Sequence, residues 1–106
     1  MSEPGLHPRH DLDRHLLHGV RMSLVAFLAE SERVQFSFVR DALEVNDPEL
    51  SRQAIYLEKV GYLEIRKGHV GRRPRTWLSV TDAGRAAFKI HLDALTRIAG
   101  FDKSAG

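Results

Sequence analysis

Three consecutive residues, Ser51, Arg52 and Gln53, carry side chains of the types that hydrogen-bond to the edges of DNA bases. An arginine can bridge O6 and N7 of guanine, and a glutamine can bridge N6 and N7 of adenine. Further along, residues 66–75 contain five cations and no acid, a composition suited to phosphate contact. Since the whole chain has a formal net charge of +2, the remainder carries −3. The chemistry indicated is local recognition of a polyanion.

A predicted helix over residues 47–60 positions the three base-reading candidates. We expect Asp47 to be its N-cap and Pro48 to occupy the first helical position, where a missing N–H is tolerated. Gly61 would end the helix in the left-handed conformation. The apolar face of this helix is formed by Leu50, Ala54 and Leu57. The opposite face carries Arg52, Ile55, Tyr56 and Lys59.

The basic run lies in a predicted hairpin. Residues 62–67 and 76–80 are rich in β-forming side chains and predict two strands. Between them, residues 68–75 contain two glycines and a proline, which indicate a loop longer than a tight turn. Cationic side chains at such a tip could reach DNA phosphates or the adjacent minor groove.

The other segments are predicted to complete one small domain. At 106 residues the chain is long enough for a single core, and residues 1–10 lack apolar periodicity and are expected to be a mobile arm. The remaining elements expected are a short helix at 11–17, a bend at Gly19, a helix at 20–30, a strand at 34–36, a helix at 37–44 capped by Ser37, and a last helix from the N-cap Thr81 to Gly100. Residues 101–106 would form a tail, which leaves residues 11–100 as the domain.

Two short helices followed by a hairpin with a basic tip predict a winged helix-turn-helix fold, mainly α with a small antiparallel β-sheet (an α+β domain). The segments that carry the pattern are LSR at 50–52, LEKVGY at 57–62, KGHVGRRPRT at 67–76 and LSVTDAGR at 78–85. With these segments the chain resembles the winged helix-turn-helix transcriptional regulators of the MarR-like and ArsR-like type, over residues 12–98. The resemblance implies a recognition helix, a wing and the start of a C-terminal helix, in a DNA-binding regulator that acts as a dimer.

The predicted contacts with double-stranded DNA fall in two groups. On the recognition helix they are Pro48, Glu49, Ser51, Arg52, Gln53, Tyr56 and Lys59, and on the wing they are Lys67, Arg72, Arg73 and Arg75. Glu49 departs from the family's pattern, which has a small or amide residue at this position. Its carboxylate would repel DNA phosphates, although it can accept a hydrogen bond from N4 of cytosine. The chain stops soon after Gly100, so the helices that build an effector pocket in larger MarR-like proteins are expected to be absent or short. No small-molecule ligand is implied.

The last predicted helix has a wider apolar arc than a single core-facing stripe requires. We therefore expect it to form a two-fold homodimer interface together with the N-terminal helix. The residues assigned to this interface are Leu12, Leu16, Leu17, Phe88, Leu92, Leu95 and Ile98.

Two other interpretations remain open. Winged helices also serve as protein-docking modules, and a lack of retention on heparin or duplex DNA would favour that role. A metal- or ligand-gated sensor is the other, because His7 with His10, and His15 with His18, form H-x-x-H pairs. With no cysteine, no membrane-spanning or signal-like segment and no catalytic constellation, the sequence predicts a cytoplasmic protein without a metal, a cofactor, catalytic residues or enzyme activity.

Overall fold

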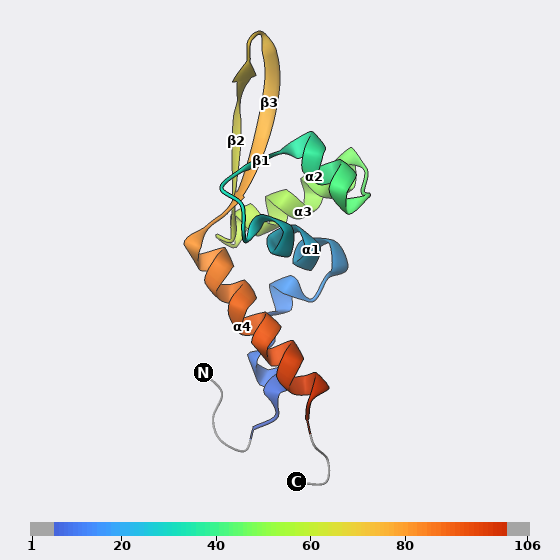
Figure 1. Ribbon diagram of the computed structural model, residues 1–106, viewed down its shortest axis with the longest axis vertical. Coiled ribbons are helices and arrows are strands. Elements are labelled where there is room, and N and C mark those ends of the chain that lie inside the picture. The colour runs from blue at the N-terminus through green and yellow to red at the C-terminus, as the bar shows by residue number, and fades with distance from the viewer. Residues whose placement is uncertain (1–5, 102–106) are drawn as a thin grey trace.

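The computed structural model describes residues 6–101 and has the predicted class, with helices packed at the base of a three-stranded antiparallel sheet (Figure 1). Its elements are the 3-10 helices η1 (Pro8–Asp11) and η2 (Arg14–Leu16), the α-helices α1 (Gly19–Leu28), α2 (Phe36–Leu43), α3 (Asp47–Lys59) and α4 (Asp82–Ala99), and the strands β1 (Val34–Gln35), β2 (Leu63–Val70) and β3 (Arg73–Val80). Within residues 6–101, no helix combines the length and apolarity needed to cross a membrane.

The sheet has the strand order β1-β3-β2, so the central strand β3 joins the short β1 to the hairpin. The hairpin of β2 and β3, residues 63–80, is called the wing below. Its register runs from Leu63 opposite Val80 to Val70 opposite Arg73. The wing projects at one end of the molecule, α4 runs toward the other end, and α1, α2 and α3 lie between them (Figure 1).

One hydrophobic core fixes α3 beneath the base of the wing. Leu24 and Leu28 of α1, Leu50 and Leu57 of α3, and Leu78 of β3 are all completely buried in it. Burial of side chains of this size contributes about 1.5–3 kcal/mol each relative to exposure. The contacts therefore hold the opposite face of α3 toward solvent.

The helix ends differ in detail from the prediction. Asn46, not Asp47, is the N-cap of α3, because its side-chain oxygen accepts a 2.9 Å hydrogen bond from the Glu49 N–H. Helix α2 begins at Phe36, two residues earlier than a cap at Ser37 would allow, and its actual N-cap Gln35 makes no side-chain cap bond. The predicted left-handed Gly61 (φ 88°) after α3 and the predicted N-cap Thr81 of α4 are confirmed.

The chain before α1 forms two short turns instead of the predicted arm and helix. The Nδ1 atom of His7 accepts from the Arg9 N–H, and the carboxylate of Asp13 accepts from the His15 N–H. These side-chain acceptors compete with helical backbone bonding, so the segment closes into η1 and η2 and α1 begins at the predicted bend. Since η1 lies against α4, the arm assigned to residues 1–10 is wrong for residues 8–10, and residues 1–5 lie outside the described range.

The hairpin turn is also tighter than predicted. Val70 pairs with Arg73, so only Gly71 and Arg72 connect the two strands. Gly71 has φ +62°, a conformation that a tight hairpin turn requires and that glycine adopts without strain. The predicted loop over residues 68–75 is therefore mostly strand, and the basic residues lie along a continuous ribbon.

Candidate nucleic-acid interface

The solvent-facing side of α3 carries three of the predicted base or phosphate contacts. Ser51, Arg52 and Lys59 are exposed, together with the apolar Ile55, whose exposed fraction is 46%. At the start of the helix, Pro48 is also exposed. These side chains form one face of a helix that the core immobilises from behind.

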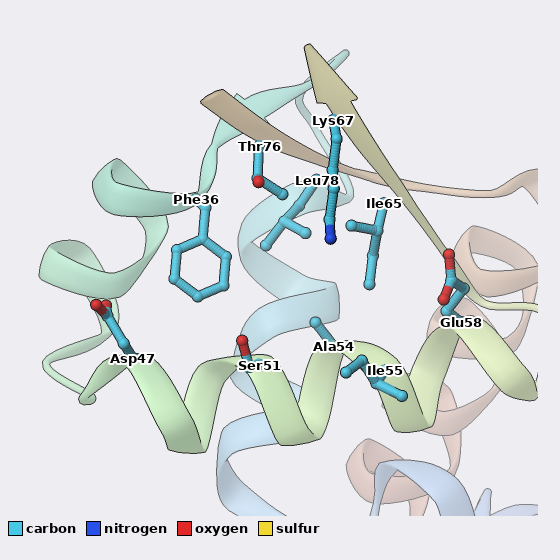
Figure 2. A pocket seen from close by; sticks show the side chains of 10 residues that line it. All are labelled: Phe36, Asp47, Ser51, Ala54, Ile55, Glu58, Ile65, Lys67, Thr76 and Leu78. Atoms are coloured by element: carbon cyan, nitrogen blue, oxygen red, sulfur yellow. The ribbon is translucent and has the colours of Figure 1, made fainter. Parts of the chain in front are cut away.

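A groove separates this face of α3 from the wing, and side chains of both elements point into it (Figure 2). It has a volume of about 820 Å³ and a floor of apolar side chains that includes Phe36, Ile65 and Leu78. Lys67 extends from β2 toward the helix, and Ser51 faces it from α3 (Figure 2). The groove thus brings one predicted helix contact, Ser51, and one predicted wing contact, Lys67, to the same concave surface.

A second hollow of about 400 Å³ lies on the other side of Ile55, which lines both hollows. Its cationic side chains are Arg21 of α1 with Arg52 and Lys59 of α3. The three cations make the electrostatic potential beside the groove positive.

Four of the five wing cations have no neutralising carboxylate in the part of the chain that the structure describes. Within residues 6–101, no carboxylate lies within ion-pair distance of Lys67, Arg72, Arg73 or Arg75, whereas Arg66 pairs with Glu64 at 3.2 Å. Arg72 and Arg73 are exposed at the tip, and Arg75 donates to the Pro74 carbonyl at 2.9 Å. The tip is therefore the part of the ribbon best able to approach phosphate.

Glu49 departs from the family pattern, but both oxygens of its carboxylate have partners within α3. One carboxylate oxygen pairs with Arg52 three residues later, and the other accepts from Nε2 of Gln53 at 3.1 Å. Its side chain is only 27% exposed. The repulsion expected between this acid and DNA is thereby offset by its own neighbours.

The structure contradicts the prediction for Gln53 and alters that for Tyr56. Gln53 is only 5% exposed, because its Oε1 accepts from Arg21 at 2.9 Å inside the domain. Tyr56 is half-buried, and its hydroxyl lies 2.8 Å from Nδ1 of His15. Neither side chain projects from α3 as Arg52 does.

Arg21 is the residue at this surface that the sequence analysis missed. It is the one charged residue in α1, and its guanidinium lies 3.9 Å from the ring centroid of Tyr56. A lone cation in an otherwise apolar helix was the available signal, because such a side chain must find a partner or reach solvent.

The structure divides the predicted dimer residues. Leu16 is completely buried in the core of its own domain, so its assignment to an interface is wrong. Phe88 packs partly against that core. Leu17 and Leu92 are 57% and 49% exposed. The remaining three, which are half-buried, are Leu12, Leu95 and Ile98.

The histidine pairs serve local structure. The Nδ1 atom of His18 caps α1 by accepting from the Arg21 N–H, and His15 contacts Tyr56. Among the side chains of residues 6–101, no three His, Cys, Asp or Glu residues come together in a group that could hold a metal ion.

Comparison with known proteins assigns the family. A family model described as a winged helix DNA-binding domain matches residues 20–99. The chain belongs to this winged helix family. The match includes all four α-helices and the wing, so the predicted winged helix-turn-helix fold is confirmed.

Individual winged helix relatives span most of the chain. An uncharacterized protein of Methanocaldococcus jannaschii is 30% identical over 73 residues, which cover 69% of this chain and 79% of the relative. The structure of a transcriptional regulator homologue from Pyrococcus horikoshii is 28% identical, with a TM-score of 0.77, and the alignment covers 85% of this chain and 90% of that one. Reduced AbfR bound to DNA shares the fold at 14% identity and a TM-score of 0.69, covering 93% and 71%. The transcriptional regulator PA4135 shares the fold at 15% identity and a TM-score of 0.68, covering 87% of this chain and 67% of that one.

Proposed function

We propose that this protein is a transcriptional regulator that binds duplex DNA sequence-specifically as a homodimer. Its site would be pseudo-palindromic, with half-sites about one helical turn apart. The observation that carries the proposal is the groove between α3 and the wing, into which Ser51 and Lys67 both point. Two elements that carry complementary DNA-binding chemistry therefore face one ligand.

The division of work between the two elements follows from their side chains. An α-helix fits the major groove, so Arg52 and Ser51 on α3 would contact base edges. The wing cations would contact phosphates, which contribute affinity for any sequence. Lys59, which lies beside Arg52 on α3, suits the phosphates beside the groove that α3 enters.

AbfR, which shares this fold, has been solved bound to DNA, and the Pyrococcus horikoshii relative is named as a transcriptional regulator homologue. These relatives support DNA as the partner and regulation of transcription as the role.

Exposed apolar side chains support the homodimer. Large apolar residues that are 49–57% exposed occur along the segment before α1 and on or just after α4. They are Leu6, Leu17, Ile90, Leu92 and Phe101. A second copy would cover such residues and place two recognition helices about a two-fold axis.

Selection of bound sites from a random duplex library tests the proposal, with light scattering of the same sample to measure mass. We expect an enriched sequence with inverted half-sites and the mass of a dimer. Retention on heparin or duplex DNA should fall steeply as salt rises. A protein that is not retained and enriches no sequence would instead favour the docking-module interpretation.

A further inference from the structure

A chain of side-chain contacts connects Arg52 on the DNA-facing surface to the interior of the domain. Arg52 pairs with Glu49, and Glu49 accepts from Nε2 of Gln53. The Oε1 atom of Gln53 accepts from Arg21 of α1 at 2.9 Å. Arg21 in turn donates through Nε to the backbone carbonyl of His15 at 2.7 Å. The exposed arginine is thus held by groups that do not themselves reach its ligand.

We propose that Gln53 and Arg21 are positioning residues that set base discrimination by fixing Arg52 through Glu49. This inference rests on the proposed DNA-binding function and extends it to residues behind the surface. The residue type of Gln53 predicts a direct contact with adenine, but in this proposal Gln53 affects base recognition only through Glu49 and Arg52.

The chemistry of the partners fixes the orientation of the Gln53 amide. Arginine has only donors, so the group facing Arg21 must be the amide oxygen. An ionised carboxylate has only acceptors, so the group facing Glu49 must be the amide nitrogen. With 5% exposure, Gln53 has little access to water that could replace either partner. Each contact therefore constrains the other.

Arg21 is itself held from three directions. Its guanidinium lies over the ring of Tyr56 at 3.9 Å, donates to the His15 carbonyl and donates to Gln53. The Tyr56 hydroxyl also contacts the His15 ring at 2.8 Å. The series of contacts that ends at Arg52 is therefore fixed at its inner end by α1, α3 and the turn before α1.

The consequence for Arg52 is a restricted set of rotamers before DNA arrives. Glu49 engages one of the five guanidinium N–H groups, and the others remain for base acceptors. A side chain of this length loses considerable rotamer entropy when it is immobilised, so prior restriction favours binding. A fixed orientation of the Arg52 guanidinium also discriminates among bases, because the side chain cannot reorient to reach acceptor atoms that a different base places elsewhere.

A double-mutant cycle on the full chain tests the inference, using the site selected by the wild type and its single base-pair variants. Gln53→Met keeps an unbranched side chain of similar size and removes both amide contacts. We expect it to reduce discrimination about fivefold at the base pair that Arg52→Ala also relaxes. In the Arg52→Ala background, Gln53→Met should change discrimination no further, because its effect passes through Arg52.

Glu49→Ala and Glu30→Ala provide a matched pair if Gln53→Met impairs folding. Both remove one acid, and the exposed Glu30, which follows α1, lines neither hollow and makes no side-chain hydrogen bond or ion pair within residues 6–101. Only Glu49→Ala should relax base choice. If Arg52→Ala relaxes it while Gln53→Met and Glu49→Ala leave it intact, or if the Gln53→Met and Arg52→Ala effects simply add, this inference is overturned and the proposed function stands. A wild type that binds no duplex, or all duplexes equally, overturns both.

Discussion

The backbone N–H of Asp13 donates a 2.9 Å hydrogen bond to Nδ1 of His91, a completely buried residue of α4. The bond requires an unprotonated Nδ1, so Nε2 carries the proton of the neutral ring. Within residues 6–101, Nε2 is buried and has no hydrogen-bond partner. Burial lowers the pKa of His91, an effect that the nearby Asp13 carboxylate opposes. The same carboxylate accepts from Tyr62, whose pKa burial and this bond raise to about 12.

The first prediction is that His91 makes the folded state less stable in mild acid. In the unfolded chain the histidine pKa is about 6.5, so the unfolded state takes up the proton first as pH falls. The contribution of neutral His91 to the free energy of unfolding should therefore be fully present above pH 6.5. It should decrease as pH falls through 6.5 toward the lower pKa of the folded state. Urea unfolding between pH 5 and pH 7.5 measures this dependence.

Replacement of His91 by Asn supplies the comparison. The Asn oxygen can occupy the position of Nδ1 and accept from Asp13 without titrating, so the variant should show a shallower pH dependence even if it is less stable overall. His69→Asn, at an exposed position on the wing, should keep the wild-type slope. Equal slopes for all three proteins would exclude His91 as the source.

The second prediction concerns Gly84, at the start of α4. A Cβ atom there would overlap the Tyr62 carbonyl oxygen and lie 2.8 Å from Cγ2 of Val80. Gly84→Ala should therefore lower the free energy of unfolding by about 1–3 kcal/mol or more, because the obstructing atom belongs to the backbone. Gly19→Ala is the control, since nothing lies within 4 Å of the added atom, and it should be neutral or slightly stabilising. If Gly84→Ala and Gly19→Ala had the same free energy of unfolding, the close approach of α4 to the segment after α3 would be contradicted.

The third prediction separates phosphate contact from base contact at the wing. Simultaneous Arg72→Ala and Arg73→Ala substitutions should weaken binding to every duplex and reduce the slope of log K against log salt by about 2. Filter binding at several salt concentrations measures both effects. Arg66→Ala should change the slope less, because Arg66 is paired with Glu64. An unchanged slope in the double variant would remove the wing tip from the interface.

The fourth prediction assigns base choice to Arg52. Arg52→Ala should cost about 1–3 kcal/mol of discrimination at one base pair of each half-site, since a bidentate contact to guanine would be lost. Competition between the selected duplex and its single-substitution variants measures this quantity. Lys59→Ala should weaken all of these duplexes alike. If the ranking of variant sites survives Arg52→Ala, another residue reads the base.

The fifth prediction locates the dimer contact on α4. Leu92→Glu puts a charge at a 49% exposed apolar position, so it should halve the mass measured by light scattering at micromolar concentration. Val70→Glu adds the same charge at a 51% exposed position on the wing and should leave the mass unchanged. A wild type that is monomeric at this concentration would remove the homodimer from the proposed function.

Local sequence signals predicted the bounds of α3 well. The cap residues near Asp47 and the left-handed Gly61 bounded α3 to within one residue, and the alternation around Val34 located β1. From residue 19 onward, the order of helices and strands followed from these signals because each acts within a few residues. The basic cluster located the wing, although Gly71 allowed a tighter turn than the composition suggested.

Errors arose where a distant partner decided the outcome. Gln53 lies three residues after Leu50 and four before Leu57, on the buried stripe, whereas its side-chain type alone predicted a contact with adenine. An amide can be buried there because Arg21, 32 residues earlier, satisfies its oxygen. Leu16 was misassigned because side-chain caps at Asp13 replaced a helical period with a 3-10 turn.

The strand order β1-β3-β2 has a further consequence for the wing. Because β1 pairs only with Leu78 and Trp77, the outer ribbon has hydrogen-bonding edges on both sides that no strand within residues 6–101 covers. Such edges can recruit strands from other molecules and start aggregation, a hazard that charged edge residues reduce. The four cations along 67–75 that pair with no carboxylate of residues 6–101 would make two wings repel each other. The positive charge thus also protects the protein in solution while it is not bound to a polyanion.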